Sequence, residues 1–240
     1  MRRVDEITDI LSRPVGRDGA SAGADPIAYR IRRSERARRV RVTVDPTHGV
    51  EVVLPRRAAE REAAAAVREL RPWIERRFAE LDRARRAIAD RGATVPYLGR
   101  SLRLVPEPQR ERVHLRGVEL LVPHGDHRPA LERWYRRAAR LEIAPRLDRA
   151  TAHAGTHYTA LTIRGQKTRW ASCSRSGAMS FNWRLLLAPE PVLDYVIWHE
   201  VCHLEVMDHS PKFWGLLAQR YPDYREQQRW LRRYGTTLVL

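Results

Sequence analysis

Lysine, cysteine and long apolar runs are all scarce in this sequence of 240 residues. Only two of its 45 basic residues are lysines, Lys167 and Lys212, and this arginine bias beside abundant alanine is typical of a GC-rich genome. No stretch approaches the roughly 18 apolar residues that cross a membrane, and the opening MRRVDEITDILSRP has no apolar core of signal-peptide length. We therefore expect a soluble, cytoplasmic protein with no membrane partner.

The two cysteines, Cys173 and Cys202, are too few for a disulfide framework, so we expect reduced thiols. The formal net charge is +16, and most of it falls before residue 157. A basic surface attracts polyanions, but codon usage accounts for part of the charge and a solvated arginine-rich face is the simpler interpretation. Nucleic acid is therefore retained as a partner that is not favoured.

The segment WHEVCHLEVMDH, residues 198–209, contains the pattern H-E-x-x-H. Histidines four residues apart lie on one face of an α-helix, so His199 and His203 can bind the same metal ion. A metal ion lowers the pKa of a bound water, and a carboxylate beside that water can accept its proton. The pattern predicts a zinc site, with one ion per chain and Glu200 as the catalytic acid and base.

His209 follows His203 by six residues, the offset at which metzincin-type sites place their third ligand. We predict that His209 completes the site. Val206 stands where metzincins have a turn-forming glycine, so we expect the same ligands on a different scaffold. The alternative is that the helical histidines are structural and that His209 caps the helix before Ser210 and Pro211.

The patterning predicts an α+β fold in three parts. Residues 1–25 are polar and lack a sustained period, so we expect a mobile leader. Residues 26–128 are expected to form an N-terminal α+β region, and residues 129–240 the zinc-hydrolase core.

Alternation over 27–54, with a turn at 45–49, predicts a small antiparallel sheet. Helices are expected over 56–70 and 72–92, followed by strands over 97–105 and 113–122. A third helix should run from Pro129 to about Ala154, with a kink or break at Pro145.

The last third of the chain predicts a strand from Tyr158 to Arg164 and a hairpin over 167–184 that turns at 175–177. Pro189 and Pro191 suit the first turn of the metal-binding helix, and Val192, Tyr195 and Val196 share the face of its histidines. Two further helices are expected, one from Pro211 and one over 222–234.

The runs KTRWASCSRSGAMSFNWRL, DYVIWHEVCHLEVMDHSPKFW, YPDY and WLRRYG resemble the YgjP-like family of bacterial zinc metallopeptidase-type proteins. The resemblance covers residues 157–235 most strongly. It implies a gluzincin-like core, in which a short sheet packs on the H-E-x-x-H helix, His199, His203 and His209 hold zinc, and Glu200 is the acid/base. Ala171 departs from the glycine that the family usually shows there.

Two substrate classes fit these residues. In the first, a metallopeptidase, an edge strand of the hairpin binds an extended peptide and Asn182 orients its backbone. In the second, a nucleoside triphosphate (UTP) pyrophosphatase, as some members of the family are described, Lys167, Arg169, Arg175 and Arg184 neutralise the phosphates. A nucleic-acid-binding protein with structural zinc is the third and least favoured class, because three protein ligands leave a position open for water.

Overall fold

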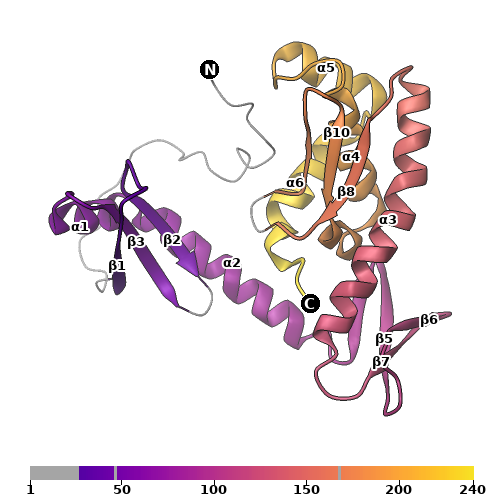
Figure 1. Cartoon of the computed structure of the whole chain (residues 1–240), viewed down its shortest axis with the longest axis horizontal. Helices are drawn as coiled ribbons and strands as arrows, with labels where there is room; N and C mark the ends of the chain where they lie inside the picture. The colour runs from indigo at the N-terminus through magenta and orange to yellow at the C-terminus, as the bar shows by residue number, and fades with distance from the viewer. Residues whose placement is uncertain (1–26, 46–47, 167–168) are drawn as a thin grey trace. The chain divides into compact units, whose positions relative to one another are not determined.

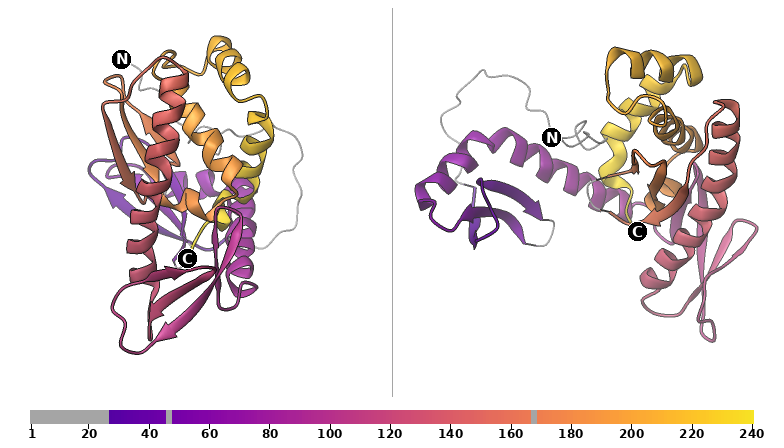
Figure 2. Two further views of the ribbon diagram at one scale, coloured as in Figure 1. Left: turned by 90° about the vertical axis from the view of Figure 1, so that its right-hand side faces the viewer. Right: turned by 45° about the horizontal axis from the view of Figure 1, so that its top comes forward.

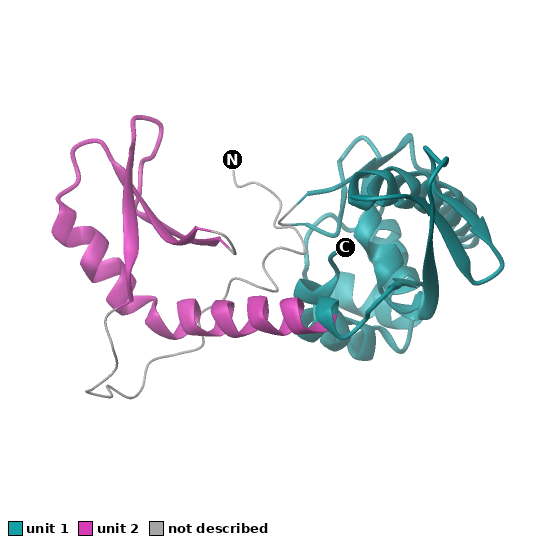
Figure 3. Ribbon diagram, turned by 90° about the horizontal axis from the view of Figure 1, so that it is seen from below, with its two compact units in different colours: residues 1–13, 88–240 teal, residues 14–87 magenta. Residues whose placement is uncertain are grey.

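The computed structural model describes residues 27–45, 48–166 and 169–240. The expected leader lies outside these residues. The chain forms two compact units that divide between Ala87 and Ile88 (Figure 3). The division lies earlier than the expected boundary at 128, because the strands after residue 93 share one apolar core with the helices that follow them.

The unit before Ile88 contains a three-stranded sheet and two helices (Figure 1). The strands are β1 (Tyr29–Ser34), β2 (Arg41–Asp45) and β3 (Gly49–Pro55), and the helices are α1 (Glu60–Glu69) and α2 (Arg71–Ala89). The sheet order is β1-β3-β2. β2 and β3 form the expected antiparallel hairpin, but β1 runs parallel to β3, so the prediction of a wholly antiparallel sheet was wrong. β3 is the most buried strand, which explains why it takes the centre, where both of its edges are paired.

The next sheet has four strands where the sequence predicted two. They are β4 (Thr94–Tyr97), β5 (Arg100–Glu107), β6 (His114–Arg116) and β7 (Glu119–Pro123), in the order β4-β5-β7-β6. A two-residue turn separates β5 from β4, which lies almost wholly before the first predicted strand, and another splits the second predicted strand. Leu98 and Gly99 have φ of 48° and 82°, and Gly117 has φ of 61°. The first turn was missed because a leucine rarely adopts a positive φ.

Helix α3 (Arg128–His153) continues without a break past Pro145, so the expected interruption does not occur. Proline removes the hydrogen bond to the carbonyl four residues earlier, here that of Leu141. Leu141 is the most exposed large apolar residue of the described chain, at 76%. Its position on the exposed side of the helix leaves the freed carbonyl near solvent, which makes the proline tolerable.

The remaining elements surround the H-E-x-x-H helix, α4 (Glu190–Cys202). They are β8 (Ala160–Arg164), β9 (Ala171–Cys173), β10 (Ala178–Asn182), the 3-10 helix η2 (Trp183–Leu187), α5 (Pro211–Arg220), α6 (Tyr224–Tyr234) and the 3-10 helix η3 (Gly235–Thr237). The sheet order is β8-β10-β9, with β8 parallel to β10. The predicted hairpin is confirmed as β9 and β10, which turn at Gly177 with φ of 77°. Helix α4 lies between α3 and α6 and contacts β9 (Figure 1, Figure 2).

Both cysteines are free, as expected. Among the described residues, no helix combines the length and the apolar character needed to cross a bilayer.

Candidate metal centre

Helix α4 is apolar on nearly all sides, as a helix between two others must be. Pro189 is its N-cap residue and Pro191 lies in its first turn, where a missing N–H costs nothing. The predicted buried face is confirmed: Val192, Tyr195 and Val196 are each 0% exposed. His199 lies within the helix, and His203 is the C-cap residue, still in the right-handed helical region, with its N–H donating to the carbonyl of His199 at 3.3 Å. The helical offset needed to align the two imidazoles is therefore preserved at the end of the helix.

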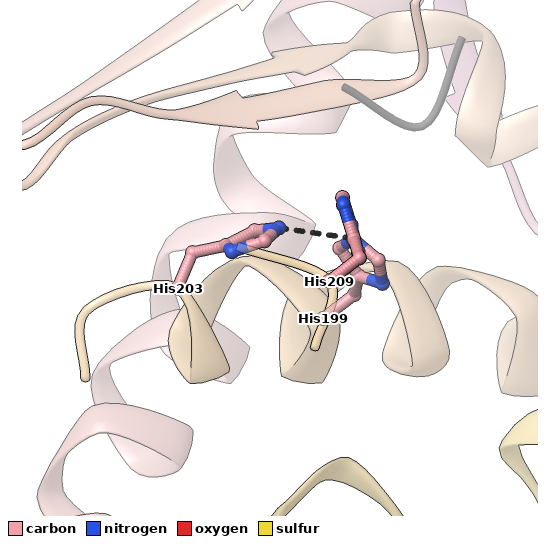
Figure 4. A group of neighbouring side chains, drawn as sticks. All are labelled: His199, His203 and His209. Carbon is pink, nitrogen blue, oxygen red and sulfur yellow. Dashed lines mark hydrogen bonds between the residues drawn. The ribbon is translucent and has the colours of Figure 1, made fainter. Parts of the chain in front are cut away.

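The three predicted histidines converge above α4 (Figure 4). The Nε2 atom of His199 lies 3.2 Å from that of His203 and 3.0 Å from that of His209. In a tetrahedral zinc site with Zn–N bonds of about 2.1 Å, ligand nitrogens lie about 3.4 Å apart. The donor set and its spacing therefore fit one metal ion.

His203 is oriented by the backbone of the loop that follows α4. Its Nδ1 atom lies 3.0 Å from the carbonyl oxygen of Val206, so Nδ1 carries the hydrogen and Nε2 keeps its lone pair for a metal. Leu98 is the only non-glycine residue of the described chain with a positive φ. The chain therefore turns from α4 towards His209 without a left-handed residue, which explains why Val206 can replace the metzincin glycine.

Two aromatic residues of α5 support the histidines, and sequence reasoning missed both. The ring of Phe213 stacks on His203 with centroids 4.5 Å apart, and Trp214 stacks on His209 at 5.6 Å. The sequence feature that could have indicated them is their place in the first turn of the helix that begins two residues after His209.

Burial lowers the pKa of His203 to about 4 and lowers the pKa of His199 well below its usual value. Both rings are therefore neutral near pH 7, the form that binds metal.

The acidic residues near the third ligand are engaged elsewhere. Asp208 is exposed at the surface, and its Oδ1 atom accepts a hydrogen bond from the N–H of Ser210 at 3.2 Å. Glu205 forms an ion pair with Arg220. The geometry thus favours His209 over either carboxylate as the third ligand.

The family model of the YgjP-like metallopeptidase domain matches residues 38–234. The chain belongs to the YgjP-like family. No curated protein and no solved structure matches it. The family thus implies a metal-dependent hydrolase, and the His199, His203 and His209 cluster is where this YgjP-like chain can hold the metal.

Glu200 is 1% exposed, between the two helical ligands of this YgjP-like site. Cys173, on strand β9, which contacts α4, lies close enough to Glu200 to be affected by its charge. Burial, and after it the negative charge of Glu200, raise the pKa of the Cys173 thiol to about 12. Cys173 is therefore a neutral thiol beside the predicted acid/base, and strand β9 lies next to the metal centre.

Strand β9 leaves one edge open among the described strands, since it pairs only with β10. The N–H of Asn182 donates to the carbonyl of Trp170 at 2.7 Å, and Ser174 donates to Ala178 at 2.9 Å. In an antiparallel ladder, hydrogen-bonded pairs alternate with non-hydrogen-bonded ones. Ala171 and Cys173 are therefore the β9 residues whose N–H and carbonyl groups point away from β10, towards the open edge.

Ala171, which departs from the usual family glycine, is 1% exposed inside this strand. Its φ is not positive. The methyl group is therefore accommodated without backbone strain, and the departure does not affect the fold of the site.

The predicted substrate residues fall into different surroundings. Lys167 lies outside the described residues. The Asn182 Nδ2 atom donates to the carbonyls of Gln166 at 2.7 Å and Arg169 at 3.0 Å, and its Oδ1 accepts from the N–H of Arg184. Asn182 is 3% exposed, so in this structure its amide fixes the segment around residue 166 and is not presented to a substrate.

Arg184, in η2, is half-buried and contacts its neighbour Trp183 and the segment that follows β8. Its guanidinium lies 4.6 Å from the ring centre of Trp183 and donates to the carbonyl of Gly165. Burial lowers its pKa. None of the three histidines is among its described partners, whereas Arg169 contributes its backbone carbonyl to the Asn182 bond. The expected role of these cations in neutralising phosphates stays a prediction.

Proposed function

We propose that this protein is a zinc-dependent hydrolase of the metallopeptidase type. The convergence of three Nε2 atoms beside the buried carboxylate of Glu200 carries the proposal. Structural zinc sites usually have four protein ligands, whereas three leave a position for water or substrate. The arrangement therefore supports catalysis over the alternative of a nucleic-acid-binding protein with structural zinc.

The chemistry follows from the residues around that position. A zinc ion bound there would polarise a water molecule and the substrate carbonyl and would lower the pKa of the water towards neutrality. Glu200 accepts the proton of the attacking water and returns it to the nitrogen of the leaving amine. Its burial keeps bulk water away from that proton transfer, and Val206 holds His203 in the tautomer the site requires.

Strand β9 gives the proposal its substrate class. An extended peptide added to the open edge would form main-chain hydrogen bonds with Ala171 and Cys173. Cys173 lies close enough to Glu200 for the carboxylate to affect its pKa, so the peptide would pass beside the acid/base. A neutral thiol at this place does not repel a peptide carbonyl.

The nucleoside triphosphate alternative depends on the cations of the hairpin. Arg184 is engaged by Trp183 and by the carbonyl of Gly165, and burial disfavours its charged form. The open edge of β9 and the engagement of Arg184 make a peptide the preferred substrate, and UTP hydrolysis remains the competing prediction.

The substrate class is tested by incubating zinc-loaded protein with unfolded peptide pools and, separately, with a panel of nucleoside triphosphates. Mass spectrometry of the peptides and release of pyrophosphate are the readouts. The same protein treated with a chelator is the control. Peptide cleavage that disappears on chelation is expected. Zinc-dependent release of pyrophosphate from UTP without peptide cleavage would replace the peptidase proposal with the nucleotide alternative.

A further inference from the structure

The three-stranded sheet of the first unit has two chemically different faces. Val50, Val52 and Leu54 of β3 belong to the apolar core formed with α1 and α2. Because side chains alternate along a strand, Glu51 and Val53 lie on the opposite face. The register places Arg30 and Arg32 of β1 beside Glu51 and Val53. Arg41 of β2 lies beside Val53 from the other side.

This outer face is basic, and none of the five residues just named exposes an apolar side chain. Arg30, Arg32 and Arg41 are exposed, whereas Val53 is 2% exposed between the flanking arginines. Residues two apart on a strand are separated by about 7 Å, and strands on either side of a central one by about 10 Å. The three guanidinium groups are therefore spread over one small surface. Among the described strand residues two carboxylates share the face: that of Glu51, which pairs with Arg32 at 3.1 Å, and that of Asp45 at the far end of β2, which lies 3.0 Å from Nδ1 of His48.

The charge is concentrated here in a way that codon usage does not explain. Residues 30–41 contain seven arginines and one acidic residue, whereas residues 60–89, which include α1 and α2, contain eight arginines and six acidic residues. Arg33, which alternation places on the core face, donates to the carbonyls of Arg56 and Ala58 and so has a structural role. Arg30 and Arg41 have no ion pair within the described part of the chain. Three of the seven arginines, Arg36, Arg38 and Arg39, lie in the loop between β1 and β2. A general bias towards arginine would have left the same balance in residues 30–41 as in the helices.

We propose that this face, formed by Arg30, Arg32 and Arg41, binds the phosphate backbone of nucleic acid. The planar guanidinium group binds phosphate through two parallel hydrogen bonds, which suits arginine to this ligand. The described residues of this face include no aromatic side chain on which a base could stack, so binding is independent of sequence. The face also lacks the exposed Trp, Phe or Leu residues that insert into a bilayer, which favours nucleic acid over an anionic membrane.

The test measures binding of the full-length protein to a fluorescein-labelled oligouridine by fluorescence anisotropy over a series of salt concentrations. The variant combines Arg30→Gln, Arg32→Gln and Arg41→Gln. Each phosphate contact contributes about −0.7 to the slope of log K against log[salt], so the slope should become less negative by about 2 and affinity near 0.1 M salt should fall about a hundredfold. Arg30→Gln alone removes one phosphate contact and should weaken binding about fivefold. This single variant provides the test if the triple variant is unfolded under the assay conditions.

The matched control combines Arg76→Gln, Arg83→Gln and Arg86→Gln, which are exposed on α2 and remove the same charge. It should retain the slope of the parent protein. Equal losses in the two triple variants would show a response to net charge alone and would overturn the site. Absence of oligouridine binding by the parent, or binding only to vesicles that contain phosphatidylserine, would also overturn it.

Discussion

The side chains of the metal centre are held in place by neighbouring groups before any metal binds. The Nδ1 atom of His203 is held by the Val206 carbonyl, and the rings of His203 and His209 are fixed by Phe213 and Trp214. Ligands held in this way lose little conformational entropy when a metal binds. The site is therefore organised by its surroundings as well as by its ligands.

At this scale the first prediction concerns the third ligand. His209→Ala should weaken zinc binding by more than the 10–100-fold that loss of a supporting residue typically costs, because it removes a ligand itself. Asp208→Ala should keep full zinc occupancy, because the Asp208 carboxylate accepts a hydrogen bond from Ser210 and is not expected to bind the metal. Zinc content after dialysis, measured by mass spectrometry of the metal, checks both variants. Full occupancy in His209→Ala with loss in Asp208→Ala would mean that the third ligand is the carboxylate.

At the scale of elements, the hairpin and the helices of the core were predictable, because turn residues and apolar spacing are local signals. The H-E-x-x-H helix and the turn at Gly177 are examples. The parallel pairings of β1 with β3 and β8 with β10 were not, because no local pattern specifies which distant strand becomes a neighbour. The use of the Asn182 amide follows from the pairing of β8 with β10, and the closeness of Cys173 to Glu200 follows from the packing of β9 on α4; both were equally hidden.

The second prediction concerns the open edge of β9. Cys173→Pro removes an N–H that points away from β10, and proline is tolerated at such a position of an edge strand. If a peptide binds there, the lost hydrogen bond should cost about 0.5–1.5 kcal/mol, or up to roughly tenfold in kcat/KM for peptide cleavage.

The comparison variant for this position is Cys173→Ala, which keeps the backbone N–H. It should cleave peptides as the parent protein does, and unfolding curves should show both variants folded. If Cys173→Pro folds and its kcat/KM is unchanged, the peptide does not pair with β9.

At the scale of the whole molecule, the two units have separate apolar cores. The three candidate metal ligands, His199, His203 and His209, all lie in the unit that begins at Ile88. His199 and His203 belong to the end of α4, and His209 to the loop before α5. A ligand stabilises the part of a protein that binds it, by about 2.7 kcal/mol when its free concentration is 100 times Kd.

The third prediction follows from this separation. Zinc should slow hydrogen exchange of backbone amides in α4 and α5 and leave the amides of β3 and α1 unchanged. Hydrogen-exchange mass spectrometry with zinc and with a chelator makes the comparison within one sample. Equal protection of both units would show that they unfold together, against the division at residue 87.

The central claim is that Glu200 moves a proton and does not bind the metal. The most direct measurement is peptide hydrolysis by Glu200→Gln together with its zinc content, because glutamine keeps the size of the side chain and removes the base. Loss of general base catalysis should lower kcat by about 10²–10⁴ while the zinc content stays at that of the parent protein. Unchanged turnover at full zinc occupancy would contradict the account.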